Sequence, residues 1–290
     1  MLSTFFQLTV SGVVMGMLYA LMALGLVLLI RSVGTMNFAQ GDFLASGAYI
    51  GYWLSVTLSM SKPMTIASNA VILVIFGVLF MFTVYWPVRN SSWPQAIIMC
   101  TIGASTVISE AVKLIWGPLP LAVEPLIKGS TKIFGAYIDN QYFVILAVTV
   151  FFIATIFLLY EKLYCGRVMQ AAAQDKYVAT LTGIPTILTT AITFAVVLII
   201  VGMGGFLVAP IMLASTNLSR LQLRAFAGVV LGGMGNLKGA VIGSLIVGLA
   251  ESYTTYITTT YKDMAVFIIM LLVLFIKPSG LFGEKIGDKA

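Results

Sequence analysis

Long uncharged runs constrain this chain more than any other feature of its sequence. They cover residues 1–30, 43–61, 63–88, 90–109, 140–160 and 186–219. An α-helix crosses a bilayer core with about 20 apolar residues, because its backbone groups then find their hydrogen-bond partners within the segment. The strands of a membrane barrel would instead alternate polar and apolar residues, and these runs are continuously apolar. Since only 9% of the residues are charged, we expect an all-α polytopic membrane protein.

The apolar pattern predicts about eight transmembrane helices, within a range of about seven to nine. The expected spans are 5–30, 43–60, 64–86, 95–116, 141–161, 186–208, 223–256 and 258–277. The seventh is too long for one crossing, so we expect a broken helix or a re-entrant piece in this C-terminal half. The first is too long for a signal-peptide core and is expected to be a retained span.

Basic residues indicate how the chain is oriented. Lys162, Arg167 and Lys176 fall in one loop, and further lysines follow residue 276. The positive-inside bias therefore places residues 162–185 and a short tail, 277–290, in the cytosol, within a single transmembrane domain that covers 1–290. The net charge of +6 is explained by these loops. No basic stripe with interleaved aromatic residues is present, so nucleic acid is not an expected partner, whereas membrane lipid is.

Missing residue types exclude several kinds of chemistry. The sequence has no histidine, which removes histidine metal sites and Ser-His triads. Cys100 and Cys165 do not form a metal-binding pair by spacing. The phosphate-binding motif GxxxxGK[ST] is also absent. We therefore expect no catalytic residues, no metal and no bound cofactor in this chain, and any ATP that it uses must be bound by another chain.

Few polar residues fall in or near the expected spans. They are Asn37, Gln40 and Asp42 in "MNFAQGDF", Glu110 with Lys113, Asn236, and Glu251. An ionisable group within a span is unfavourable unless it has a function or a buried partner. Glu110 and Lys113 lie three residues apart and are expected to pair with each other. For Asp42, capping of the following helix is at least as good an explanation as contact with a solute.

Glycine is unusually dense between residues 228 and 243. Small residues at helical spacing normally allow membrane helices to pack closely, and this explains most other glycines of the chain. Here, however, each glycine weakens a helix by about 1 kcal/mol relative to alanine, so an unwound turn is expected near Gly232–Asn236. Such a turn would serve as a solute path or a hinge. The candidate residues are Gly232, Gly233, Gly235, Asn236 and Gly239.

The segment "YCGRVMQAAAQDKYVATLTGIP" at 164–185 is a polar patch between two apolar runs. Good helix formers predict a short helix over 167–174. Asp175 is a candidate N-cap for a second helix over 176–182, and Gly183 with Pro185 ends it. A solvated loop is the simpler interpretation, but a loop that only connects spans could be much shorter. We interpret the patch as a cytosolic docking surface.

Four stretches together resemble one known family over nearly the whole chain. They are "LYALMALGLVLLIRSVGTMNFAQGDFLASGAYIGY" (18–52), "GRVMQAAAQDKYVATLTGI" (166–184), "RAFAGVVLGGMGNLKGAVIGSLIVGLAES" (224–252) and "KPSGLFG" (277–283). The chain is similar to permease subunits of ABC importers for branched-chain amino acids and their relatives. The resemblance implies an inner-membrane permease that pairs with a second homologous permease. It also implies two cytosolic ATPase subunits, which bind ATP and Mg²⁺, and an extracytoplasmic solute-binding protein.

The resemblance also assigns roles to residues. Within the ATPase-coupling loop at 162–185, the matching positions are Gly166, Arg167, Ala172, Asp175 and Gly183. The first half of the solute path or hinge matches at Asn37, Phe38, Ala39, Gly41 and Asp42, and the second half at Gly232, Gly233, Gly235 and Gly239. Gln40 and Asn236 are further candidates for this path or hinge by their place within the two motifs. Gln40 replaces the more usual histidine, and Met36 the usual isoleucine or valine. These departures leave the solute open among branched-chain amino acids, other amino acids, urea and short-chain amides.

Two other classes of function compete with an importer subunit. A stand-alone secondary transporter or channel could use the broken Gly-rich segment and an ion gradient. An intramembrane enzyme is a weaker alternative, since the chain offers neither histidine nor a convincing acid pair.

Overall fold

The computed structural model confirms an all-α membrane fold and describes residues 2–91, 93, 95–133, 135–174 and 176–283. The chain divides into two compact units, 1–27 with 127–150 and 222–290, and 28–126 with 151–221. We refer to them as unit 1 and unit 2. Both α1 (Leu2–Val33) and α6 (Asn140–Phe157) pass from one unit into the other along their length.

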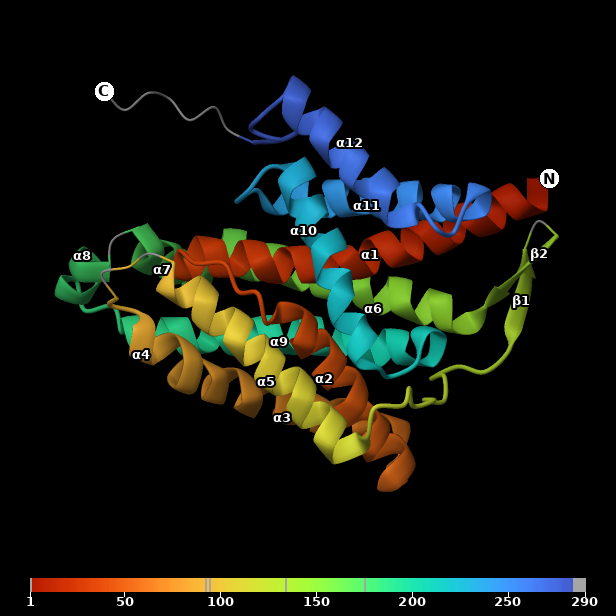
Figure 1. Ribbon diagram of the computed structural model, residues 1–290. Coiled ribbons are helices and arrows are strands. Elements are labelled where there is room, and N and C mark those ends of the chain that lie inside the picture. The colour runs from red at the N-terminus through yellow and green to blue at the C-terminus, as the bar shows by residue number, and fades with distance from the viewer. Residues whose placement is uncertain (1, 92, 94, 134, 175, 284–290) are drawn as a thin grey trace. The chain divides into compact units, whose positions relative to one another are not determined.

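Unit 1 combines parts of these two long helices with the C-terminal part of the chain (Figure 1). Its further elements are β1 (Ser130–Ile133), β2 (Ala136–Asp139), α10 (Leu221–Gly232), α11 (Leu237–Ile257) and α12 (Lys262–Ile276). β1 and β2 form an antiparallel hairpin with Ser130 opposite Asp139. This hairpin falls in the segment before the expected span at 141–161, where no strand was predicted.

Unit 2 contains the remaining helices. They are α2 (Gln40–Tyr52), η1 (Trp53–Thr57), α3 (Lys62–Phe80), η2 (Met81–Tyr85), α4 (Trp86–Val88), α5 (Ala96–Trp116), η3 (Leu158–Lys162), α7 (Tyr164–Gln174), α8 (Lys176–Leu181), α9 (Thr186–Met212) and η4 (Thr216–Arg220). Three of the short elements, η1, η2 and η3, are single π-helical turns that continue a preceding α-helix.

Six helices in the described part of the chain are long and apolar enough to cross a membrane. They cover Ser3–Val33, Lys62–Val88, Ala96–Trp116, Asn140–Lys162, Thr186–Met212 and Leu237–Ile257. The expected count of about eight is therefore not confirmed. The two remaining expected spans correspond to α2, which has 13 residues and continues for 5 more through η1, and to α12 with 15 residues. A full crossing takes about 20.

The expected break in the C-terminal half is confirmed. α10 ends at Gly232 and α11 begins at Leu237. Gly233 and Gly235, in the turn between them, have φ values of 103° and 91°. Only glycine adopts this conformation without strain, which explains why the Gly-rich sequence interrupts one long apolar stretch.

The core of unit 2 is a close contact between α2 and α9. A Cβ atom on Gly47 would overlap the carbonyl oxygen of Gly202, and one on Gly205 would overlap that of Leu44. α3 packs on the other side of Gly202 through the buried side chain of Leu73. Glycine thus lets the two backbones touch where lipid offers no hydrophobic drive for helix association.

We predict that Gly47→Ala destabilises the protein, whereas Gly103→Ala does not. The new methyl group at position 47 meets the backbone of α9, and overpacking of this kind costs about 1–3 kcal/mol. At Gly103, in α5, a Cβ would have no neighbour within 4 Å, and alanine favours a helix over glycine by about 1 kcal/mol. Thermal unfolding in detergent compares the two variants. Equal unfolding temperatures would contradict the packing role of Gly47.

Candidate functional site

The segment 162–185, named the coupling segment below, forms two short helices as expected, α7 and α8 (Figure 1). α7 packs on the preceding π turn through one face, which carries Gly166, Met169 and Ala172, all buried. A Cβ on Gly166 would overlap the carbonyl oxygen of Leu159. Gln170 Nε2 also donates a hydrogen bond to the Tyr160 carbonyl over 2.8 Å. The segment is therefore fixed to the end of a membrane helix.

Other side chains of the coupling segment are exposed, and several of them are apolar. Tyr164, Val178 and Leu181 are 77%, 51% and 70% exposed, and Arg167, which lies between Tyr164 and Val178 in the sequence, is also exposed. Gly183 follows the end of α8 and has a φ of 81°. The predicted N-cap Asp175 lies outside the described residues. Of the residues expected to couple to an ATPase, Gly166 and Ala172 thus lie on the buried face of α7. Arg167 is exposed to solvent.

Asn37, Gln40 and Asp42 are all buried at the start of α2, in unit 2. Asn37 Oδ1 accepts a hydrogen bond from the Ala39 backbone N–H over 2.9 Å. Asp42 accepts one from the Ser105 hydroxyl of α5. The N-cap of α2 is Ala39, which makes no side-chain capping bond. Asp42 lies in the first turn of α2, and its bond to Ser105 also links two helices.

The second group of expected path or hinge residues lies in unit 1, in the turn between α10 and α11. A Cβ on Gly232 would overlap the Gly239 carbonyl, and Gly233 lies against Gly280 and Gly283. Only open space surrounds the Cβ position of Gly235. The Asn236 side chain caps α11, since its Oδ1 accepts from the Gly239 N–H over 3.0 Å, and its Nδ2 donates to the Phe282 carbonyl over 2.9 Å. The turn is thus held by backbone contacts and by one amide.

A buried ionic cluster in unit 1 joins four helices. Arg224 of α10 lies 3.0 Å from Glu251 of α11 and 2.6 Å from Asp263 of α12. The Tyr19 hydroxyl of α1 donates to Glu251 over 2.5 Å and accepts from Arg224 over 3.2 Å. The Arg224 and Glu251 side chains are only 12% and 11% exposed. Sequence reasoning had singled out Glu251 but not its partner. The requirement that a buried acid be paired was the signal that could have pointed to Arg224.

Glu110 and Lys113 form the expected pair, with 2.6 Å between Lys113 Nζ and Glu110 Oε1. Both side chains are substantially exposed, and an exposed pair of this kind contributes little to stability. We assign it no further role.

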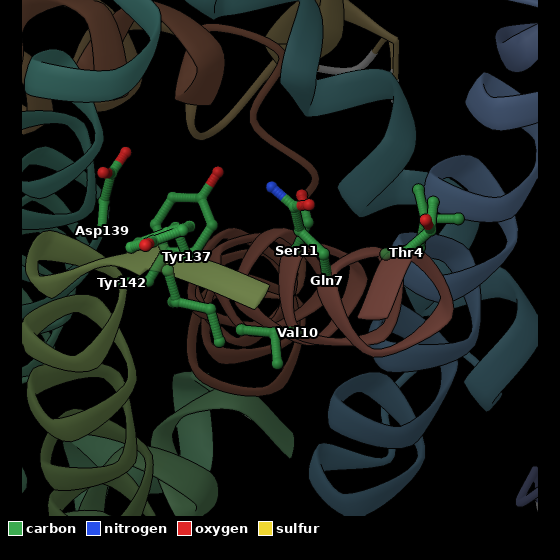
Figure 2. A pocket seen from close by; sticks show the side chains of 9 residues that line it. Thr4, Gln7, Val10, Ser11, Tyr137, Asp139 and Tyr142 are labelled. Carbon is green, nitrogen blue, oxygen red and sulfur yellow. The ribbon is translucent and has the colours of Figure 1, made fainter. Parts of the chain in front are cut away.

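Two cavities combine polar and apolar walls, one in each unit. The cavity in unit 1 has a volume of about 220 Å³ and lies between the start of α1 and the β2–α6 connection. Figure 2 shows Gln7 and Ser11 of α1 projecting to the same side as Tyr137 and Asp139. The cavity in unit 2 is larger, about 420 Å³, and lies between η1, the start of α3, residues 122–126 and α9.

Comparison with known proteins assigns the chain to a family. The family described as "Branched-chain amino acid transport system / permease component" matches residues 8–274. This chain is a member of that family. The match covers both units and the coupling segment, and it places the chain among transport permeases rather than in an enzyme family.

Curated members of this permease family are similar over their full length. The chain is 32% identical to the high-affinity branched-chain amino acid transport system permease proteins LivH of Salmonella typhimurium and of Escherichia coli K12, covering 98% of this chain and 97% of each relative. It is 29% identical to the corresponding protein BraD of Pseudomonas aeruginosa, with 98% of each chain covered.

One solved structure shares the fold. PsaBC from Streptococcus pneumoniae, in complex with Fab, superposes with a TM-score of 0.53 and 14% identity, covering 94% of this permease and 92% of that chain. At this identity the similarity concerns the fold alone.

For this permease we predict that Arg224→Met destabilises unit 1 strongly and Asp263→Asn only weakly. The first substitution leaves the Glu251 carboxylate buried without its guanidinium, and breaking a buried ion pair costs about 3–5 kcal/mol. The Asp263 side chain is 59% exposed, and exposed pairs contribute about 0–1 kcal/mol. Thermal unfolding of the purified variants measures the difference. Equal shifts, or a larger one for Asp263→Asn, would contradict the assignment of Glu251 as the main partner of Arg224.

Proposed function

We propose that the chain is a permease subunit of an ATP-driven importer for branched-chain or related amino acids. It would form the solute path together with a second homologous permease and couple to two separate cytosolic ATPase subunits. An extracytoplasmic binding protein would deliver the solute. The branched-chain amino acid transport named for the similar LivH and BraD proteins supports this solute class.

The coupling segment is the observation on which this proposal mainly rests. A loop that only joins α6 to α9 would not need two helices, a buried glycine contact and a side-chain bond to the preceding turn. Its rigid attachment suits a part that must transmit force to the membrane helices. Its exposed apolar side chains suit a surface that another protein covers, because such residues are uncommon in groups on a face that remains in water.

The remaining roles follow from this proposal. Residues 1–290 act as one permease domain in the cytoplasmic membrane of a bacterium or archaeon, with 162–185 and the tail 277–290 on the cytosolic side. ATP and Mg²⁺ are bound by the ATPase subunits. Asn37, Gln40 and Asp42 belong to the solute path, and the turn with Gly233 and Gly235 serves as a hinge, because its backbone conformation does not extend either adjoining helix.

Reconstitution into liposomes tests the proposed function. We expect uptake of leucine only when the partner permease, the ATPases, the binding protein and ATP are all present. Uptake by the isolated chain, without nucleotide or partners, would instead establish the stand-alone transporter that the sequence left as the alternative.

We predict that Leu181→Glu prevents co-purification of the ATPases with the permease. The Leu181 side chain is 70% exposed on α8, so a charge there leaves the fold intact but would be buried without a partner in an apolar protein interface. Leu119→Glu provides a matched control, since Leu119 is 73% exposed and one membrane crossing, Asn140–Lys162, separates it from the coupling segment. Normal ATPase yield with Leu181→Glu, or equal loss with both variants, would count against docking at the coupling segment.

A further inference from the structure

The larger cavity, in unit 2, carries charges of both signs at its edge. Lys62, the first residue of α3, and Glu124, in the segment before β1, both line it and are both exposed. The positive-inside bias places residues 162–185 in the cytosol, and one membrane crossing, Asn140–Lys162, separates them from residues 117–140, which we therefore place outside the cell. Lys62 lies against this outer segment. We refer to this space as the outer cavity. Its charged edge is therefore accessible from the side at which a solute arrives.

The Lys62 ammonium is positioned by the chain itself. It donates to the Leu126 carbonyl over 2.6 Å and approaches the Pro125 carbonyl at 3.4 Å. An ammonium has three N–H donors, so capacity remains for an incoming carboxylate. Lys62 also begins a helix of 19 residues, and its charge adds to the positive end of that helix dipole. A carboxylate acceptor such as Glu124 offers about four lone-pair sites and can receive an ammonium in addition to other contacts.

Most of the remaining wall is apolar, with Ser55 and Thr65 as its uncharged polar residues. Phe206 of α9 is 3% exposed and belongs to a buried cluster with Leu73 and Met203, while Met60 and Leu126 line the cavity with it. The volume of about 420 Å³ falls within the range of about 300–1,000 Å³ that is usual for small-molecule sites. An aliphatic side chain can therefore be buried there while its polar end stays at the charged edge.

The smaller cavity, in unit 1, does not offer this combination. Among the described residues that line it, Asp139 is the one charged group, and the volume is about 220 Å³. A carboxylate without a neighbouring cation suits an amine, but it leaves the acidic end of an amino acid unmatched.

We propose that the outer cavity receives the transported solute as a zwitterion, with its carboxylate at Lys62, its ammonium at Glu124 and its aliphatic side chain against Met60, Leu126 and Phe206. This inference rests on the proposed import of amino acids and specifies where on this chain the solute first binds. It names α-amino acids with apolar side chains as the ligand class. Urea and uncharged amides lack the two charges that this site matches.

The first experiment measures leucine uptake by the complete reconstituted importer as the concentration of leucine-loaded binding protein is varied. We expect Lys62→Gln and Glu124→Gln each to lower the maximal rate about tenfold, which corresponds to about 1.4 kcal/mol, without changing the concentration that gives half the maximal rate. Lys62→Arg should retain most of the activity. Lys132→Gln removes the same charge from an exposed position outside the cavity and should behave as the unaltered protein.

Two results would overturn the proposal. An unchanged maximal rate in both neutral variants would show that the charges do not contact the solute. A higher half-maximal concentration with an unchanged maximal rate would show that Lys62 and Glu124 dock the binding protein instead.

A second experiment separates the cavity from the proposed function. Met60→Cys is introduced into a chain with Cys100→Ser and Cys165→Ser, and its alkylation by a membrane-impermeant maleimide is followed in the assembled importer. Millimolar leucine should slow the reaction, whereas leucinamide and 4-methylpentanoate, which lack the carboxylate and the ammonium, should not. Protection without leucine uptake would contradict the proposed function but support the cavity. Uptake without protection would contradict the cavity alone.

Discussion

In both units, helices meet through main-chain atoms at glycine positions. α2 meets α9 where Gly47 faces Gly202, and α10 meets α11 where Gly232 faces Gly239. α11 also meets α1, because a Cβ on Gly248 would overlap the Gly16 backbone. Lipid removes the hydrophobic drive that brings helices together in water, so association depends on close van der Waals contact. The positions of the cavity walls and of the buried polar groups follow from these contacts.

The ionic cluster around Arg224 depends on the same close packing. Tyr19, Arg224 and Glu251 come from three helices, and they reach one another because glycines let those helices approach. A charged group buried away from water is costly unless a partner and further hydrogen bonds compensate it. The cluster meets this condition, since the tyrosine hydroxyl and Asp263 complete the environment of the guanidinium. It therefore links α1, α10, α11 and α12 within unit 1.

Features that depend on local sequence could be predicted well. Helix propensity predicts α7 and α8 of the coupling segment, and apolar length predicts the long spans. The conformational freedom of glycine predicts the break after Gly232. Features that depend on distant partners could not be predicted. The acceptor role of Asp42 depends on Ser105, and the capping role of Asn236 depends on how α11 begins. The span count differs because α2 begins with the polar residues Gln40 and Asp42, and because α12 ends after 15 residues. An apolar run alone does not reveal where a helix begins or ends.

Within unit 2, one helix connects the coupling segment to the outer cavity. α9 contacts both α7 and α8, and it also supplies Phe206 to the cavity wall. It has 27 residues, and a rise of 1.5 Å per residue makes it about 40 Å long. Glycine contacts fix α9 to α2 without flexible side chains between the two backbones. Closely packed interiors transmit strain, and these two helices are packed through their backbones. A displacement imposed on α7 and α8 of the coupling segment would therefore reach the apolar wall of the outer cavity through α9.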